Sequence, residues 1–176
     1  SGTLGAIFTD LGNGATFSHA VRAAKLNGFT EPDPRDDLSG LDVARKALIL
    51  ARTIGRQVDL DEIAVENLVP EALRDLDVPA FMDRLDDLDA AWLERSAAAR
   101  ANGATLKYVA SVPAEGAIRV GVQEVATDSL LGALQGPENV VIMRTARYQA
   151  NPLTIVGPGA GAAVTAAGMT GDLLAR

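Results

Sequence analysis

The sequence predicts an α+β fold in which a mostly antiparallel or mixed sheet carries helices packed on one face. Apolar residues recur at helical spacing through roughly the first hundred of the 176 positions. Beyond residue 105 they instead alternate or run together in short segments separated by turn residues. The halves also differ in charge, because 16 of the 23 acidic residues fall between Glu31 and Asp89. The length suits one domain over residues 1–176.

Two helices are predicted before residue 30, on either side of a glycine-rich break. The first covers residues 1–11, and the Gly-Asn-Gly run at 12–14 ends it. The second begins near Phe17 and stops at Gly28. The only histidine, His19, lies in this second helix and receives no functional role.

A third helix is predicted to begin at Ser39, which has the character of an N-cap. Asp42 would then stand at the third helical position, as in a capping box. Gly55 ends this helix. Its predicted buried stripe consists of Leu41, Ala44, Leu48, Ala51 and Ile54.

The remaining elements complete the α+β pattern. Residues 63–69 suggest a short strand, and a helix is predicted from Asp77 to about Gly103 with Trp92 on its buried stripe. Strands are predicted over 106–112, 118–125, 140–148 and 153–156, with a hairpin turn at 113–116. The last predicted helix covers 162–174. The sheet formed by these strands is expected to cover helices with one face and to offer the other to a second subunit.

Composition excludes several kinds of protein. The absence of cysteine removes disulfides and thiolate metal sites, and a single histidine argues against a histidine-based metal cluster. A net charge of −7 disfavours nucleic acid as a partner, since phosphate binding needs a basic face. No apolar run approaches membrane-spanning length, and no secretory signal opens the chain. We therefore expect an acidic cytoplasmic protein that binds neither nucleic acid nor membrane.

The stretch from Thr30 to Lys46 is the main candidate for a site. Two X-Pro dipeptides bias Glu31 and Asp33 towards extended conformations. Asp42 and Lys46 stand four residues apart, so they share a helical face. Glu31, Asp37, Asp42 and Lys46 could thus converge on a small polar substrate.

Three interpretations of this stretch remain open from the residues alone. In the first, Asp42 caps its helix, Arg35 pairs with a neighbouring carboxylate and Lys46 extends to water. In the second, Lys46 lies beside the apolar stripe, is partly buried and serves as a proton donor next to Asp42. In the third, Mg²⁺ or Ca²⁺ is bound by the carboxylates of Glu31, Asp33, Asp36 and Asp37, although the calcium-loop spacing is absent and Lys46 would compete with a cation.

A glycine-rich segment precedes the last helix. Gly157, Gly159 and Ala162 superficially fit a dinucleotide fingerprint, but Pro158 interrupts it and no strand follows. As an independent cofactor site it is therefore disfavoured, and a tight turn from a strand into a helix is the better interpretation.

The run TEPDPRDDLSGLDVARK, over residues 30–46, resembles the signature of the homoserine dehydrogenases. The chain is most similar to the C-terminal part of the bifunctional aspartokinase–homoserine dehydrogenases. The resemblance implies interconversion of aspartate semialdehyde and homoserine with NAD(P)H, in threonine and methionine biosynthesis. It is carried further by SGTLGAIF at the start, then ALILAR, LKYV, ARYQANPL and GPGAGAAVTAAGMTGDLL.

The resemblance also implies roles for individual residues. Lys46 would protonate the alkoxide that forms when hydride reaches the aldehyde carbon, and Asp42 would orient Lys46. Glu31 and Asp37 would hold the amino acid end of the substrate, directly or through water.

Other positions match the family's pocket. Gly2 and Thr3 would line the substrate site, and Gly159 and Gly161 would lie near the nicotinamide. Phe29 stands where family members often carry tyrosine, so one polar contact of the family is missing here.

Finally, the resemblance implies domains and partners that this sequence does not contain. The family places a Rossmann nucleotide-binding domain before the SGT motif, and the helix over 161–175 normally packs on that domain. We therefore expect residues 1–176 to be the substrate-binding, catalytic and dimerisation domain, which binds no NAD(P) and has little turnover alone. A homodimer through the sheet and an aspartokinase domain in the same polypeptide are also implied.

Overall fold

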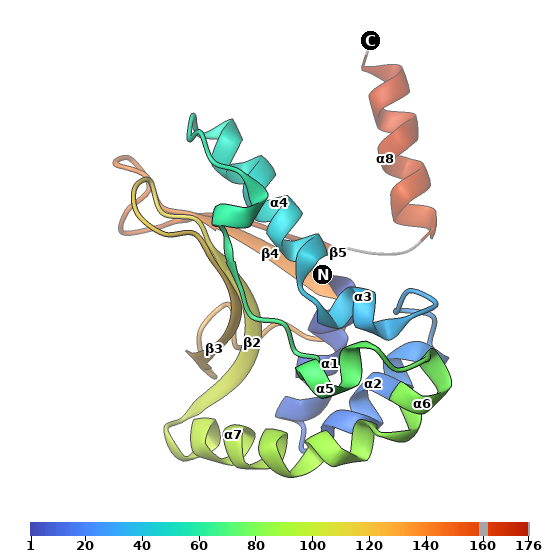
Figure 1. Ribbon diagram of the computed structural model, residues 1–176. Coiled ribbons are helices and arrows are strands. Elements are labelled where there is room, and N and C mark those ends of the chain that lie inside the picture. Colours follow the sequence, from blue (N-terminus) through green and yellow to red (C-terminus); the bar gives the residue numbers. More distant parts are fainter. Residues whose placement is uncertain (159–161, 176) are drawn as a thin grey trace.

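The computed structural model describes residues 1–158 and 162–175 and has the predicted α+β fold (Figure 1). Helices fill the first hundred residues, and most strands follow them. The helices are α1 (Gly2–Gly12), α2 (Phe17–Leu26), α3 (Pro34–Leu38), α4 (Leu41–Thr53), α5 (Glu71–Arg74), α6 (Val78–Asp83), α7 (Asp89–Ala101) and α8 (Ala162–Leu174), with 3-10 turns η1 (Leu60–Glu62) and η2 (Leu85–Leu88). The strands are β1 (Ala64–Val65), β2 (Ala104–Ser111), β3 (Arg119–Ala126), β4 (Glu138–Met143) and β5 (Leu153–Pro158).

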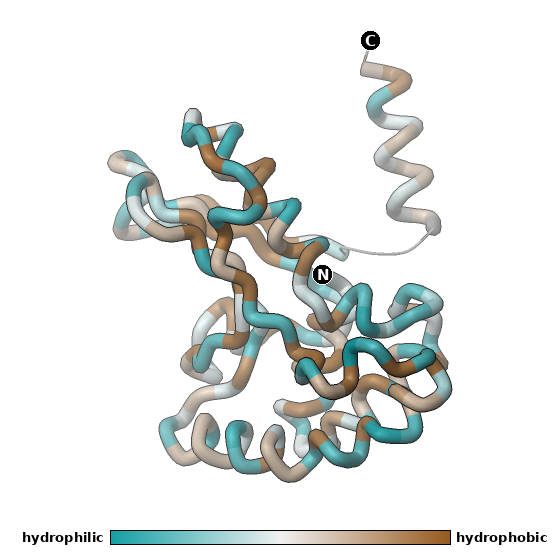
Figure 2. The backbone as a smooth tube through the Cα atoms, in the orientation of Figure 1, coloured by the Kyte–Doolittle hydropathy of each residue, from teal (hydrophilic) through white to brown (hydrophobic). Residues whose placement is uncertain are grey.

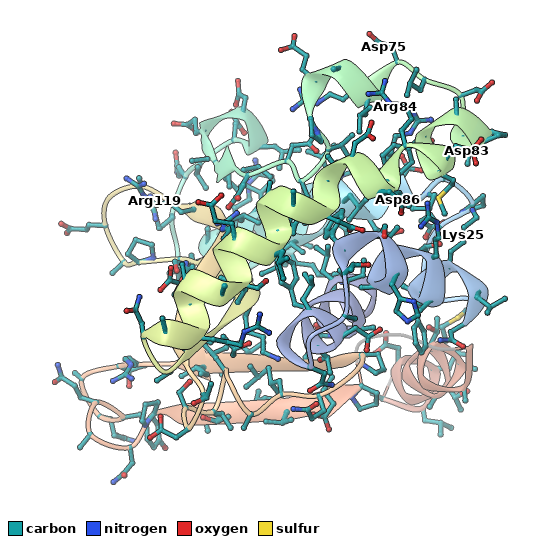
Figure 3. The ribbon with its side chains drawn as sticks, turned by 90° about the horizontal axis from the view of Figure 1, so that it is seen from below. Lys25, Asp75, Asp83, Arg84, Asp86 and Arg119 are labelled. Atoms are coloured by element: carbon teal, nitrogen blue, oxygen red, sulfur yellow. The ribbon has the colours of Figure 1, made fainter. Side chains whose placement is uncertain are left out.

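The strands form two sheets in place of the single sheet expected. β2 and β3 are the predicted antiparallel hairpin, with Lys107 opposite Gln123, and β1 joins β3 in parallel. β4 and β5 form a separate antiparallel pair. Helices α1 and α7 pack against β2, and α1 also contacts β4. Figure 3 shows the β4–β5 pair as a layer of its own, whereas Asp75 and Asp83 lie at the edge of the helical half away from that pair.

Aromatic side chains join the helices in the core. The Trp92 ring of α7 stacks on Phe17 of α2 with centroids 4.8 Å apart, and it meets the edge of Phe8 of α1 at 5.7 Å. Phe8 and Phe17 are fully buried, which stabilises the fold by about 2 kcal/mol for each side chain. The prediction that Trp92 belongs to the core is confirmed.

The start of α4 differs from the predicted capping box. The N-cap is Gly40, whose φ of +74° is a left-handed conformation that glycine adopts without steric penalty. Ser39 instead follows the last residue of α3, where its hydroxyl donates to the Asp36 carbonyl at 2.7 Å and accepts from the Leu41 amide at 3.3 Å. Asp42 is therefore the second helical residue and closes no capping box.

The predicted buried stripe of α4 is also partly wrong. Leu41 and Ile54 are 42% and 59% exposed. Ala44 and Ala51 are buried as predicted and Leu48 is partly buried, so the buried face is displaced only at the ends of the predicted stripe. The alanines on this face are small enough for close approach to β2 and β3. Figure 2 shows that apolar residues recur along α4, and two of them, Ile49 and Leu50, are 64% and 42% exposed. The buried row consists of Val43, Ala44, Ala47 and Ala51.

Three predicted elements are shorter than expected. The strand over 63–69 keeps only β1, because the Leu68 amide leaves the sheet and donates to the Leu38 carbonyl at 2.9 Å. The helix from Asp77 is divided into α6, η2 and α7. The strand over 140–148 ends at Met143, since the Tyr148 amide turns back to the Thr145 hydroxyl at 3.1 Å.

Candidate active site

Two prolines and an aspartate shape the acidic loop, which comprises residues 29–38. Asp33 has the extended backbone that the following proline favours, with φ −102° and ψ 109°. Its carboxylate accepts from the Arg35 amide at 3.0 Å and so caps α3. Pro34 occupies the start of that helix, where its missing N–H costs nothing. The loop therefore closes with a helical turn over 34–38, which the sequence did not predict.

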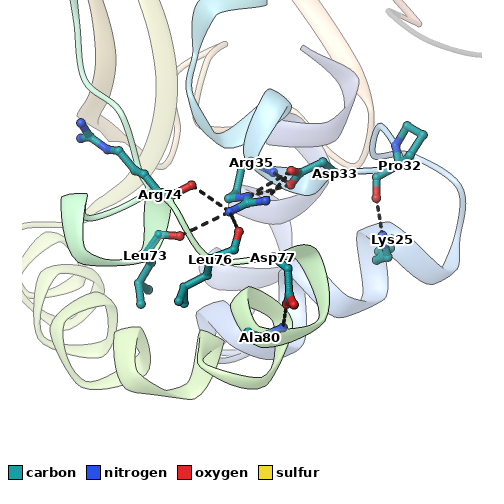
Figure 4. A network of polar contacts seen from close by, with 9 residues as sticks. All are labelled: Lys25, Pro32, Asp33, Arg35, Leu73, Arg74, Leu76, Asp77 and Ala80. Atoms are coloured by element: carbon teal, nitrogen blue, oxygen red, sulfur yellow. Dashed lines mark hydrogen bonds and ion pairs between the residues drawn. The ribbon is translucent and has the colours of Figure 1, made fainter.

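Arg35 fixes this loop to the rest of the helical half (Figure 4). Its Nε and Nη2 donate to the Asp33 carboxylate at 3.0 and 2.7 Å. Its Nη1 donates to the carbonyls of Arg74, at 2.9 Å, and Leu76, and its guanidinium lies 5.3 Å from the centre of the Phe81 ring. The hydrogen bonds from Arg35 hold the pKa of Asp33 below its usual value.

Asp37 organises the next layer of the loop. Its Oδ1 lies 2.8 Å from the Thr3 hydroxyl, and its Oδ2 accepts from the Glu31 amide at 2.8 Å. The Thr3 hydroxyl also contacts the Phe29 carbonyl. Thr3 is buried, and these bonds join the start of α1 to both ends of the acidic loop. Four predicted substrate-site residues, Thr3, Phe29, Glu31 and Asp37, are thus brought together.

Asp42 and Lys46 form an ion pair on the first two turns of α4. Lys46 Nζ lies 2.9 Å from Asp42 Oδ2, and each side chain is 53% exposed. The predicted sharing of one helical face is confirmed. Because the pair is half-exposed, a bound molecule can reach the ammonium group without displacing the helix.

Ser1, the N-cap of α1, lies near both the loop and the ion pair. Its backbone nitrogen donates to Asn139 Oδ1 of β4 at 2.9 Å, and its hydroxyl accepts from the Leu4 amide at 3.4 Å. The first turn of α1, the acidic loop and the start of α4 therefore form one polar surface.

The other predicted site residues take little or no part in these side-chain contacts. Gly2 is buried in the first turn of α1. The Glu31 carboxylate is exposed, and within the described part of the chain no hydrogen bond to its oxygens is found. Phe29 is 37% exposed and contributes its carbonyl oxygen. Gly159 and Gly161 lie outside the described residues.

The metal interpretation gains no support from the geometry. Among residues 1–158 and 162–175, no group of three or more histidine, aspartate or glutamate side chains is arranged to hold a metal ion. Asp33 is occupied by Arg35, and Asp37 by Thr3 and the Glu31 amide.

No helix within residues 1–158 and 162–175 is long and apolar enough to cross a membrane.

Sequence reasoning missed the residues that hold the site in place. Arg35 was noted only as a partner for a carboxylate, yet it also binds backbone carbonyls some forty residues away. Gly40 directly precedes α4 with a φ of +74°, and the available signal was the glycine itself, since a glycine before a helix start is a common N-cap. Tyr108 packs against Gly40, and no sequence pattern linked these two positions.

Comparison with known proteins identifies the family. The homoserine dehydrogenase family model matches residues 1–174. The chain is 47% identical over 161 residues to homoserine dehydrogenase from Paracoccidioides brasiliensis, covering 90% of this chain and 43% of that protein. It is 42% identical over 173 residues to bifunctional aspartokinase/homoserine dehydrogenase 2 from Escherichia coli, covering 98% of this chain and 21% of that protein. The chain thus spans less than half the length of these relatives.

Solved structures share the fold. A crystal structure of a Candida auris protein of unknown function has a TM-score of 0.92 and 40% identity, covering 99% of this chain and 50% of that one. A crystal structure of S. aureus homoserine dehydrogenase has a TM-score of 0.74 and 22% identity, covering 98% and 40%. With a family model that covers nearly every residue and relatives above 40% identity, this chain belongs to the homoserine dehydrogenase family.

Proposed function

We propose that this chain is the substrate-binding and catalytic part of an enzyme that interconverts L-aspartate 4-semialdehyde and L-homoserine. The observation that carries the proposal is the Asp42–Lys46 pair, 2.9 Å apart and half-exposed, beside the loop held by Asp37. Lysine is a suitable proton donor to an oxygen that gains negative charge. The paired carboxylate keeps that lysine in one orientation.

Lys46 acts on the oxygen of the substrate in this proposal. Hydride arrives at the aldehyde carbon, the electron pair of the C=O bond moves to oxygen, and Lys46 gives that oxygen a proton. In the reverse direction the neutral Lys46 takes the proton from the homoserine hydroxyl. Asp42 fixes the position of the Lys46 Nζ by the ion pair.

The acidic loop binds the other end of the substrate. An amino acid carries an ammonium group, and Glu31 and Asp37 offer carboxylate oxygens from a loop fixed by hydrogen bonds. The Thr3 side chain fixes Asp37 and contacts the Phe29 carbonyl, while Gly2 directly precedes Thr3 in the first turn of α1. The acidic character of this surface fits an amino acid and does not fit the phosphates of a dinucleotide.

The cofactor is therefore assigned to another part of the enzyme. We infer that NAD(P)H, which supplies the hydride when bound, is held by a nucleotide-binding domain that precedes Ser1 in the intact enzyme. Gly159 and Gly161 would lie near the nicotinamide, and α8 would pack on that domain. Met169, Leu173 and Leu174 of α8 are 66%, 74% and 82% exposed, which supports a missing partner for this helix. Little turnover is expected from residues 1–176 alone.

A homodimer through the β4–β5 sheet is part of the proposal. Val141 and Ile155 are cross-strand partners, and Leu153 lies two residues from Ile155, so the three side chains share one face. They are 36%, 58% and 44% exposed, and an apolar sheet face of this kind favours burial against a second copy.

We also propose a cytoplasmic location and, by analogy with the bifunctional relatives, an aspartokinase domain in the same polypeptide.

The test is an activity comparison between the intact enzyme and residues 1–176. The intact enzyme should reduce NAD(P)⁺ when homoserine is added, whereas residues 1–176 should show no turnover above background. The positioning that makes hydride transfer fast is shared between two domains. Rapid oxidation of homoserine by residues 1–176 would contradict the division of the site, and an inactive intact enzyme would contradict the function itself.

A further inference from the structure

The start of α4 is enclosed by the side chain of Tyr108. A Cβ atom added at Gly40 would collide with the Tyr108 hydroxyl oxygen and would lie 2.8 Å from its Cζ. The Gly40 amide donates to the Asp37 carbonyl at 3.2 Å, and its carbonyl accepts from the Ala44 amide at 3.0 Å. Gly40 therefore connects the acidic loop to α4, the helix that carries Asp42. The Tyr108 ring packs directly against this connection.

Tyr108 is itself held in place by the sheet. Its hydroxyl donates to the Glu66 carbonyl at 2.6 Å, and the Glu66 amide donates to the Val120 carbonyl at 2.8 Å. The Glu66 carboxylate accepts from the Val122 amide at 2.8 Å and from Arg95 at 2.7 Å. Burial, with a smaller contribution from Glu66, raises the pKa of Tyr108 to about 12. The hydroxyl therefore stays protonated and keeps its hydrogen bond at neutral pH.

The same ring also touches the helix that brings Thr3 to the site. Tyr108 and Phe8 are roughly parallel, with 29° between their planes and centroids 6.3 Å apart. Phe8 is fully buried in α1, whose first turn contains Thr3. One side chain on β2 thus contacts both α1 and the start of α4. These two elements supply the substrate-holding and proton-donating parts of the proposed site.

We propose that Tyr108 is a positioning residue for this reaction. It sets where α4 begins relative to α1, and so it sets where Lys46 Nζ lies relative to a substrate held by Asp37. Tyr108 does not touch the substrate, so it acts through Gly40. The proposal rests on the proposed function, because the consequence for Lys46 matters only if Lys46 is the proton donor. The effect on the start of α4 is independent of any activity.

The first test is hydrogen exchange in the intact enzyme carrying Tyr108→Phe. Phenylalanine keeps the contact with Phe8 but removes the oxygen that packs on Gly40 and bonds to Glu66. Exchange in a peptide covering 41–47 should be about tenfold faster, whereas exchange in a peptide covering 48–54 should match the wild type. Tyr148→Phe is the matched control, since Tyr148 is 43% exposed and lies in the 144–152 segment. Equal exchange at 41–47 in both variants would overturn the proposal.

The second test separates kcat from KM in the same variants. Tyr108→Phe should lower kcat for homoserine oxidation about tenfold, because a small misplacement of a reacting group slows the chemical step. KM should change less than about twofold, since Asp37 stays on the loop anchored by Arg35. Faster exchange with an unchanged kcat would also overturn the proposal. If wild type and Tyr148→Phe are both inactive, the proposed function fails, and the exchange result alone decides the role of Tyr108 at α4.

Discussion

The Thr3 hydroxyl and an Asp37 carboxylate oxygen lie 2.8 Å apart, and this contact connects α1 to the acidic loop. Thr3 has a single hydroxyl proton, and its oxygen lies within hydrogen-bond distance of two acceptors, Asp37 Oδ1 and the Phe29 carbonyl. A buried side chain with two acceptors so close has no room for another partner. The loop that contains Glu31 is therefore positioned by α1 as much as by its own prolines.

Replacing Thr3 should damage both the fold and the substrate site. Thr3→Val keeps the shape but removes the donor, so Asp37 Oδ1 and the Phe29 carbonyl lose their partner. We expect a loss of about 2 kcal/mol in the free energy of unfolding, measured by urea denaturation. KM for homoserine should rise about tenfold. Thr3→Ser, which retains the hydroxyl, should stay close to wild type in both, and equal KM values for the two variants would contradict the assignment.

Gly40→Ala should be much more destabilising than the same change at Gly28. Both glycines have positive φ, +74° and +71°, so each substitution adds the left-handed strain of about 1 kcal/mol. At Gly40 the new Cβ would also collide with Tyr108, whereas at Gly28 no atom lies within 4 Å. We expect a total loss of about 3 kcal/mol at Gly40, measured by urea denaturation. Equal losses at the two positions would show that the start of α4 can move away from Tyr108.

The Asp33–Arg35 pair should make stability depend on pH in the acid range. The pKa of Asp33 is lower in the folded state than its unfolded value of about 3.9. Its contribution is therefore complete above pH 4 or so and is lost as the pH falls through the folded pKa. Asp33→Asn can still cap α3 but cannot form the ion pair.

The measurement is the difference in unfolding free energy between wild type and Asp33→Asn, from pH 7 down to the acid limit of folding. The difference should be constant near neutrality and should shrink below about pH 4. A difference that stays the same throughout the acid range would show that the carboxylate charge contributes nothing to the loop.

The proposed dimer predicts that a charge on the β4–β5 sheet will separate the subunits. Ile155→Glu places a carboxylate in the centre of the apolar face shared with Val141 and Leu153, and burying it costs several kcal/mol. Light scattering should give a dimer for the wild type and a monomer for Ile155→Glu. Leu26→Glu is the control, because Leu26 is 88% exposed at the end of α2. A dimer that survives Ile155→Glu would place the interface elsewhere.

Much of the fold could be predicted from local patterns, and the failures have physical causes. The β2–β3 hairpin, the helices before residue 30 and the Asp77 cap of α6 depend on neighbouring residues, and all are present. The start of α4 was predicted wrongly because Ser39 is a good cap in isolation, whereas contact with Tyr108 requires a glycine at the next position. The division into two sheets depends on long-range packing that periodicity does not encode.

The candidate site, like the fold, could be predicted only in part from the sequence. The i, i+4 spacing predicted the Asp42–Lys46 pair, and the resemblance to the family indicated which carboxylates belong with it. Neither predicted that Asp37 would be shared between Thr3 and the Glu31 amide, or that Arg35 would bind the carbonyls of Arg74 and Leu76. The contact of Asp37 with Thr3 and those of Arg35 with the two carbonyls join positions more than thirty residues apart. Only the folded chain brings them together.

The central claim, that Lys46 is the proton donor, is tested most directly by Lys46→Ala in the intact enzyme. An exposed ion pair contributes less than about 1 kcal/mol, so the melting temperature should barely change, as for Arg84→Ala, which breaks a comparably exposed pair with Asp87. The kcat for NAD(P)⁺-dependent oxidation of homoserine should nevertheless fall at least about 100-fold in Lys46→Ala. Arg84→Ala should retain the wild-type rate. A Lys46→Ala enzyme that is folded and turns over at the wild-type rate would contradict the account.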